Sequence, residues 1–408
     1  MRALLAIVWA TCAAAVSHAS LVLAVEPPYQ ALARRTVGVG QGVYAVAADG
    51  TVLASEAADR PVHPASVSKI PTTTALLHEL GPNYRFATTL RGIGGVREGA
   101  VWGDLVVDGS GDPFLVAESA ALILAELSQA GVDRVGGSLR VHGDLFFNWK
   151  PDPGGRAFEL ALSGRIDPAT WRAAAARLGA RVNGAPTGLA FENARPMPAS
   201  VAPGPADPLL LVHLSPSLQR ILKELNGYSN NVFHPLSERI GGPAAVERLA
   251  RASVPSELAD EIVITNAAGA GTANRISPRA SVALVRALDR EVARHGLTLA
   301  DVLPVAGVDR GTLDGRFDEP DLRGTVVGKT GTYGSLGASA LAGVARTRRW
   351  GDVTFAILNR DVPVDEARRR QNAFVTALLH DAGPVPLDVV PVDSPILVDE
   401  RIETRSGG

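Results

Sequence analysis

The chain has 408 residues, of which 46% are hydrophobic and 20% charged, and its formal net charge at pH 7 is −2. This balance provides no basic surface for nucleic acid and no acidic tail, and it is ordinary for a globular protein. The length suggests two domains, and the 42 Gly and 28 Pro indicate many turns and short strands rather than a helical bundle.

Residues 1–24 have the pattern of a secretory signal peptide. Arg2 supplies a positive charge, and an apolar run over residues 3–16 follows it. A transmembrane anchor is the alternative, but polar side chains interrupt the ~20 apolar residues that a spanning helix needs. Cys12 is the only cysteine and lies in this segment, so the mature protein would carry no disulfide. Export without disulfides fits a bacterial periplasm or cell surface.

The first half of the chain is predicted to contain a hairpin, a helix and a β-rich region. An Asp-Gly turn between two apolar runs predicts a hairpin over residues 43–53. Apolar residues at helical spacing and a Gly-Pro stop predict a helix over 66–80. We further expect strands at 105–107 and 139–141, a helix near 117–130 and a Pro-rich linker over 185–208.

Ser66-Val67-Ser68-Lys69 opens the first predicted helix. Ser66 and Lys69 are three residues apart, so both side chains are expected on one helix face. Only four of the 40 basic side chains are Lys, and Lys, unlike Arg, can lose its proton when buried. A neutral amine beside a hydroxyl can activate it, so the pattern indicates a serine nucleophile with a lysine base. By itself this four-residue pattern also occurs by chance.

The second half is predicted to be helical and then to form a sheet. Helical patterns lie near 216–226, 229–240, 243–252 and 278–295. Three apolar segments, near 324–328, 337–346 and 352–359, read as consecutive antiparallel strands. A last helix near 364–381 precedes a Pro-rich tail.

Two further motifs follow in this half. Ser229-Asn230-Asn231 lies at the start of a predicted helix, where a capping role is the simpler interpretation. Lys329-Thr330-Gly331-Thr332 follows a predicted strand; a phosphate-binding loop is excluded because Arg323 stands where that motif needs Gly. Each motif is weak alone. The ordered set of three, with Lys at both basic places of a Lys-poor chain, is specific.

In these motifs the sequence resembles the penicillin-recognising serine enzymes. The closest resemblance is to class C low-molecular-mass penicillin-binding proteins, the D-alanyl-D-alanine carboxypeptidase/endopeptidases, and it covers most of residues 38–360. Gly109–Pro113 and Leu303–Asp309 also match. Ser229 lies 163 positions after Ser66 and 100 before Lys329. The first interval is too long for class A β-lactamases and implies an inserted domain.

The resemblance implies an α/β (α+β) fold. This is a penicillin-binding-protein/β-lactamase-like transpeptidase domain, an antiparallel sheet flanked by helices, with a smaller inserted α/β domain. The expected organisation is a signal peptide over 1–24, a discontinuous catalytic domain over 25–88 and 205–385, an inserted domain over 89–204 that is short for the family, and a tail over 386–408.

The resemblance also implies roles for individual residues. Ser66 would be acylated with Lys69 as its base, and the backbone N–H groups of Ser66 and Thr332 would form an oxyanion hole. The other expected roles are a proton relay at Ser229, orientation of Lys69 and substrate by Asn231, positive charge at Lys329, and substrate binding by Thr330, Gly331 and Thr332, whose threonines would hold the terminal carboxylate.

The expected function is that of a periplasmic serine D,D-peptidase. It would act on peptidoglycan stem peptides and be inhibited covalently by β-lactams, with no metal, cofactor or nucleic acid. Carboxypeptidase against endopeptidase preference and oligomeric state stay open. Family positions for side-chain recognition are altered at Thr272, His142 and Gly334. A substrate-altered or non-catalytic penicillin-binding-like protein, or a β-lactamase, is therefore the alternative.

Overall fold

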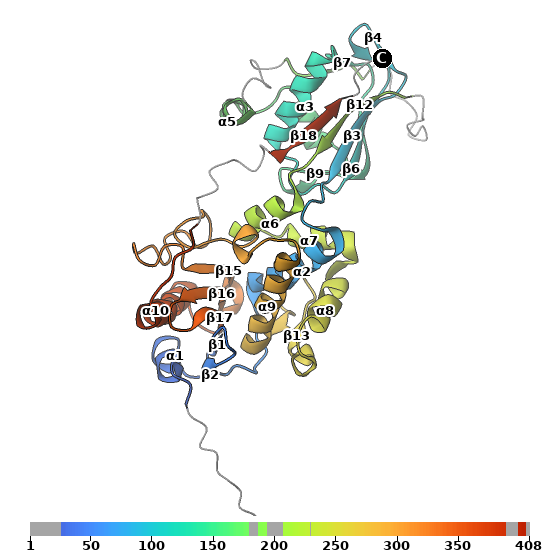
Figure 1. The fold of residues 1–408 in the computed structure, drawn as a ribbon. Coiled ribbons are helices and arrows are strands. Elements are labelled where there is room, and N and C mark those ends of the chain that lie inside the picture. Colours follow the sequence, from blue (N-terminus) through green and yellow to red (C-terminus); the bar gives the residue numbers. More distant parts are fainter. Residues whose placement is uncertain (1–25, 179–186, 194–206, 229, 389–398, 405–408) are drawn as a thin grey trace, which may run out of the picture.

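The structure is a computed structural model that describes residues 26–178, 187–193, 207–228, 230–388 and 399–404. These residues fold into two lobes (Figure 1). The expected signal peptide, 1–24, and most of the expected linker, 185–208, lie outside the described residues. Within the described ranges, no helix has both the length and the apolar character needed to cross a bilayer.

The larger lobe is built on a five-stranded antiparallel sheet of order β15-β16-β17-β1-β2. Its strands are β1 (Gly42–Val46), β2 (Val52–Glu56), β15 (Val326–Tyr333), β16 (Ala338–Thr347) and β17 (Gly351–Asn359). The predicted hairpin and the three predicted apolar strands are confirmed, although β15 runs five residues past its predicted end. Alternate side chains enter different cores: Ala340 and Ala342 pack on one face and Leu341 on the other.

Helices cover both faces of this sheet (Figure 1). Helices α1 (Gln30–Thr36) and α10 (Val364–Ala382) lie on one face. The core on the other face is formed with α2 (Lys69–Leu80), α6 (Leu218–Gly227), α7 (Phe233–Ser237), α8 (Gly242–Ala252) and α9 (Pro278–Arg294). A short pair, β13 (Ile262–Val263) and β14 (Arg275–Ile276), and the 3-10 turns η4 (Ser256–Glu261) and η5 (Leu299–Asp301) complete this side.

Two predicted helices begin later than expected. Ser66 lies in a 3-10 turn, η1 (Ala65–Ser68), whose first residue, Ala65, has φ +47°, and the α-helix begins only at Lys69. The helix predicted over 229–240 starts at Phe233 and continues as η3 (Glu238–Ile240). Before it, the Asn230 amide donates to the carbonyls of Leu225 and Tyr228, a local turn that competes with helix.

The smaller lobe contains a five-stranded mixed sheet of order β18-β12-β3-β6-β8. The strands are β3 (Ala87–Gly92), β6 (Leu105–Ser110), β8 (Leu139–Asp144), β12 (Leu209–Leu214) and β18 (Arg401–Thr404). The helix predicted near 117–130 is confirmed as α3 (Ala117–Gln129), which connects the parallel pair β6 and β8 and packs on the core of this lobe. Since β3, β12 and β18 belong here, the lobe extends beyond the predicted range 89–204, and the predicted tail contains its edge strand.

Smaller elements complete this lobe. They are the four-stranded sheet β11-β7-β5-β4 (Ala190–Phe191, Arg134–Val135, Ala100–Val101, Val96–Arg97), the hairpin β9 (Phe146–Phe147) and β10 (Lys150–Pro151), and the helices α4 (Arg156–Leu162) and α5 (Pro168–Leu178).

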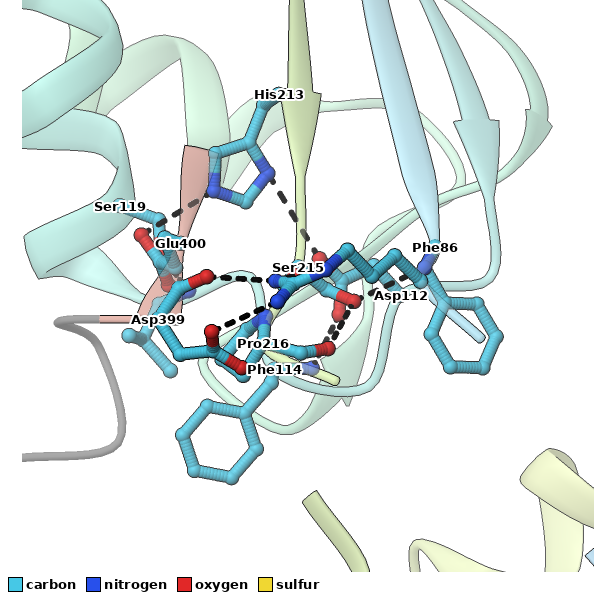
Figure 2. Close-up of polar contacts among 11 residues, drawn as sticks. Phe86, Asp112, Phe114, Ser119, His213, Ser215, Pro216, Asp399 and Glu400 are labelled. Atoms are coloured by element: carbon cyan, nitrogen blue, oxygen red, sulfur yellow. Dashed lines mark hydrogen bonds and ion pairs between the residues drawn. The ribbon is translucent and has the colours of Figure 1, made fainter. Parts of the chain in front are cut away.

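Buried charges attach the C-terminal strand to this lobe (Figure 2). The His213 ring lies between two carboxylates, with Nε2 3.2 Å from Glu400 and Nδ1 3.8 Å from Asp112. Ser119 on α3 donates to the other oxygen of Glu400 at 2.7 Å. All four side chains are buried. Because Glu400 immediately precedes β18, this cluster fixes the start of that strand to the rest of the lobe.

Candidate active site

Ser66 and Lys69 lie at the junction of η1 and α2, where the sequence predicted a nucleophile and its base. The Ser66 hydroxyl, half-buried, donates to the carbonyl of Ala268 at 3.4 Å. The Lys69 side chain is fully buried, and its Nζ donates to the carbonyl of Asn230 at 2.6 Å. The same Nζ lies 5.4 Å from the centre of the Phe233 ring. Burial lowers the pKa of Lys69 to about 8.

Strand β15 brings the third motif against η1 at Gly331. A Cβ on this glycine would lie 2.7 Å from the carbonyl oxygen of Pro64 and 3.0 Å from the backbone nitrogen of Ser66. Gly269 approaches from another direction: a Cβ there would lie 2.0 Å from the carbonyl oxygen of Ala65. Both contacts require glycine. They bring two segments distant in sequence into direct contact with the turn that carries Ser66.

Lys329 lies within the same buried region as Lys69. Its side chain is 1% exposed, and its Nζ donates to the carbonyl of Thr330 at 2.9 Å. Burial holds the pKa of Lys329 well below its ordinary value, and the positive charge of Lys69 lowers it further. Two amines that share one buried region favour a state in which at least one is neutral.

The two threonines of the third motif have different surroundings. Thr330 is buried and its hydroxyl donates to Thr312 Oγ1 at 2.6 Å. Thr332 is exposed, and its hydroxyl accepts from the Arg368 guanidinium at 3.4 Å. Sequence reasoning missed Thr312 and Arg368. Neither lies in a motif, and only the fold brings α10 and the loop around Thr312 to this end of β15.

The second motif lies beside Lys69, but not through the contact that was expected. Ser229 lies outside the described residues. Asn231 is exposed, and its carbonyl accepts from the backbone N–H of His234 at 3.1 Å at the start of α7. The carbonyl of Asn230 is what accepts the bond from Lys69. Among the described residues, no contact joins Asn231 to Lys69, so the predicted orienting role of Asn231 stays a prediction. The main chain of neighbouring Asn230 contacts Lys69 instead.

A third lysine fixes the segment before β15. Lys223 on α6 donates to the carbonyls of Ala300 and Leu303 and to the carboxylate of Asp309, at 2.8, 2.7 and 2.5 Å. Burial lowers the pKa of Lys223, while the charge of Asp309 opposes this. The lysine thus has a structural role, joining α6 to the Leu303–Asp309 stretch that the sequence singled out.

The positions expected to recognise a substrate side chain are spread over three segments. Thr272 is exposed in the loop after β13, and its carbonyl accepts from the Arg275 guanidinium at 2.6 Å. The same nitrogen of Arg275 donates to Asn274 O at 2.7 Å. His142 is an exposed residue of β8, 3.6 Å from the carboxylate of Asp108. Gly334 begins the turn η6 (Gly334–Leu336) after β15.

Among the described residues, Glu319, Asp321 and His380 form the group of His and carboxylate side chains close enough together to hold a metal ion. All three are exposed, and exposed acidic groups commonly stand together without an ion. The junction of η1, α2 and β15 carries the hydroxyl of Ser66 and the buried amines of Lys69 and Lys329, which are the kinds of side chain that acyl transfer uses.

Both a family model and a known protein similar to this chain are carboxypeptidases. The family model described as the D-Ala-D-Ala carboxypeptidase 3 (S13) family matches residues 31–154 and 199–380. Carboxypeptidase DacB of Mycolicibacterium smegmatis is 26% identical over 371 residues, which cover 81% of this chain and 78% of that protein.

Solved structures share the fold. The predatory endopeptidase Bd0816 of Bdellovibrio bacteriovorus, solved with immunity protein Bd3460, aligns with a TM-score of 0.72 at 23% identity, covering 89% of this chain and 99% of that one. Penicillin-binding protein 4 (dacB) of Haemophilus influenzae, complexed with a β-lactam, aligns with a TM-score of 0.61 at 17% identity, covering 87% and 99%.

Proposed function

This chain belongs to the D-Ala-D-Ala carboxypeptidase 3 (S13) family and is an enzyme of that carboxypeptidase/endopeptidase class, and we propose that it works through an acyl-enzyme on Ser66. The observation that carries the proposal is the contact of Gly331 with the backbone nitrogen of Ser66. It places the Lys329 motif beside the turn that presents the serine, with buried Lys69 one residue beyond that turn.

Lys69 is the proposed general base. With a pKa of about 8, roughly a tenth of the molecules hold the neutral amine at pH 7. The neutral amine takes the Ser66 proton as Oγ attacks the carbonyl carbon of the penultimate D-Ala. Attack requires the hydroxyl to leave the carbonyl of Ala268, to which it donates in this structure.

The tetrahedral oxyanion would be stabilised by the N–H groups of Ser66 and Thr332. The close approach of Gly331 to Ser66 N supports this pairing, because Thr332 directly follows on the same strand. Such preorganised donors are each worth ~3–4 kcal/mol of transition-state stabilisation in related chemistry. Collapse of the intermediate releases the terminal D-Ala amine, with Ser229 as the proposed proton relay, and water then hydrolyses the ester.

Lys329, Thr330 and Thr332 are proposed to bind the terminal carboxylate, with Asn231 contacting the substrate amide. A bound carboxylate would raise the pKa of Lys329, because an opposite charge favours the ammonium form. An ammonium there would in turn favour the neutral form of Lys69. Substrate binding would therefore favour neutral Lys69 as the base and protonated Lys329 as the cation.

The site also favours an altered recognition of the stem peptide. Thr272 stands where the resembling family usually carries an arginine, and nearby Arg275 already donates to the carbonyls of Thr272 and Asn274. We therefore propose that a free diaminopimelate side chain is recognised poorly, while acylation is intact. A periplasmic location after removal of residues 1–24, and covalent inhibition by β-lactams, belong to the same proposal.

Labelling with a fluorescent penicillin tests the nucleophile. Wild type should form a stable covalent adduct, and S66A should form none while unfolding at a similar temperature. Release of D-Ala from a D-Ala-D-Ala peptide should be lost in the same variant. Labelling of folded S66A would refute the assignment, and rapid turnover of the penicillin by wild type would identify a β-lactamase instead.

A further inference from the structure

His63 lies three residues before Ser66 and connects three parts of the site. Its ring is buried, and Nδ1 accepts from the backbone N–H of Ala65 at 3.2 Å. Nε2 lies 3.0 Å from the carbonyl oxygen of Gly271. The ring packs on that of Tyr333, which directly follows the Lys329 motif, with centroids 5.2 Å apart. Because a carbonyl can only accept, Nε2 carries the proton, and the imidazole is neutral with both nitrogens satisfied.

The residue that His63 holds is in a strained conformation. Ala65 has φ +47°, the left-handed region that residues with a Cβ rarely adopt. Such strain persists only where surrounding contacts impose it. Three contacts do so here: Ala65 donates its N–H to His63, its carbonyl lies against Gly269, and its Cβ lies against Gly331. The φ and ψ of Ala65 set the direction of the next residue, which is Ser66.

We propose that neutral His63 is a positioning residue for acylation: it holds Ala65 in the left-handed conformation that aims the Ser66 hydroxyl and N–H, and protonation of the ring releases this hold. The proposal rests on the proposed role of Ser66 as nucleophile. A protonated ring would carry N–H on both nitrogens, so Nδ1 would face the Ala65 N–H as a second donor and the bond would be lost.

The surroundings keep the ring neutral near pH 7. Burial lowers the pKa of His63 first; its bond to Gly271 opposes this, and the positive charge of Arg275 on β14 lowers the pKa again. From β15 the titratable neighbour is Tyr333. Neither η1 nor the loop over 265–272 contains a charged residue, and Asp59 and Arg60 upstream are exposed. The hold on Ala65 is therefore lost only in acid, below the ordinary His pKa.

Two protonations would then limit acylation in different pH ranges. Lys69 must be neutral to act as base, so the logarithm of the acylation rate rises with a slope of about one below its pKa. Where His63 is also protonated, a second proton must leave, and the slope approaches two. This second increase in slope is a signature that a merely structural histidine would not produce.

Three variants separate the acceptor from the packing of the ring. In H63N the side-chain amide oxygen can accept from the N–H two residues on, as Asn does in turns, without titrating. H63F keeps an aromatic ring against Tyr333 but has no acceptor, and H63A has neither. The second-order rate of acylation by a fluorescent penicillin should be measured for each from about pH 4.5 to 8, the range in which a histidine titrates.

We expect H63N to acylate near the wild-type rate at pH 7 and to keep a slope of about one throughout. H63F and H63A should both be slower by about 10- to 100-fold, the range expected when a buried N–H loses its acceptor. Wild-type rates in H63F, or a slope of two retained in H63N, would overturn the proposal. Unfolding temperatures monitor folding. Loss of wild-type labelling at pH 7, or labelling of S66A, would instead mark failure of the proposed nucleophile.

Discussion

Gly331 and Ser66 are in contact across the boundary between β15 and η1, so that a Cβ on Gly331 would stand 3.0 Å from the backbone nitrogen of Ser66. Its other neighbours would be the carbonyl oxygen of Pro64 at 2.7 Å and the Cβ of Ala65 at 3.0 Å. Main-chain atoms cannot give way as the end of a flexible side chain can. This contact therefore fixes the separation between the two segments on which the proposed oxyanion hole depends.

G331A should separate β15 from η1. We expect acylation by penicillin to fall about 100-fold or more, because an oxyanion-hole donor would move, and stability to fall by ~1–3 kcal/mol, as for other overpacked sites. G334A is the matched control: a Cβ there would meet only a Val364 methyl at 4.0 Å. Stopped-flow acylation and thermal unfolding measure the two effects. Equal rates for the two variants would contradict the argument.

K69M should abolish acylation and change the pH dependence of stability. The pKa of Lys69 is about 8 in the folded protein and ordinarily 10.5, so between these values the unfolded chain binds a proton that the folded chain lacks. Lys69 therefore contributes a rise in wild-type stability as pH increases from about 8 to 10.5, and K69M should show a smaller rise, because the buried amines of Lys329 and Lys223, whose pKa values are also lowered, still contribute. At pH 7 the variant should be more stable by ~1–3 kcal/mol, because no buried ammonium remains. Denaturant unfolding across pH checks the sign.

R368Q should weaken recognition of the substrate carboxylate. The guanidinium lies 3.4 Å from Thr332 Oγ1, at the proposed carboxylate site, and its side chain is about half exposed. We expect KM for a peptide with a free C-terminal carboxylate to rise about 3- to 10-fold with little change in kcat, as for loss of an exposed charge-assisted bond. R369Q is the control, since Arg369 is exposed and pairs with Glu366. A KM change of equal size in both variants would argue against the role.

Peptide specificity should reflect Thr272. Wild type should cleave a D-Ala-D-Ala peptide carrying a free diaminopimelate arm no faster than its capped lysine analogue. T272R should raise kcat/KM for the free arm by about tenfold relative to the capped analogue, since a guanidinium can pair with its carboxylate. Competition between the two peptides measures the ratio directly. A strong wild-type preference for the free arm would refute the altered pocket.

The cluster around His213 should make the smaller lobe more stable in mild acid than in base. Burial raises the pKa of Asp112 to about 7 against the opposing charge of His213, and the pKa of His213 is raised by Glu400 in spite of burial. Both groups hold protons more tightly in the folded state, so stability is lost as pH rises from about 4 through these raised values. D112N should flatten the decline, whereas E403Q, on exposed β18, should follow wild type. Thermal unfolding between about pH 4 and 8 follows the decline.

The sequence by itself determined the local elements and the chemistry. The Asp49-Gly50 turn separates two strands through its local conformation, whatever the rest of the chain does. The alternating or helical spacing of apolar residues predicted most of the strands and helices to within a few residues. The ordered set of three motifs, with Lys at both basic places of a Lys-poor chain, was enough to predict a serine nucleophile and a lysine base, because the reaction restricts which side chains can serve.

Only the tertiary structure decided the contacts between distant segments. No pattern in the sequence says that Gly331 meets Ser66, that Asn230 rather than Asn231 bonds Lys69, or that Glu400 returns to His213. The sequence likewise did not predict the left-handed conformation of Ala65 or its hydrogen bond to His63. Alanine disfavours positive φ, so this conformation exists only because packed neighbours impose it. Local preferences act over a few residues, whereas closing long loops is governed by the packing of whole faces.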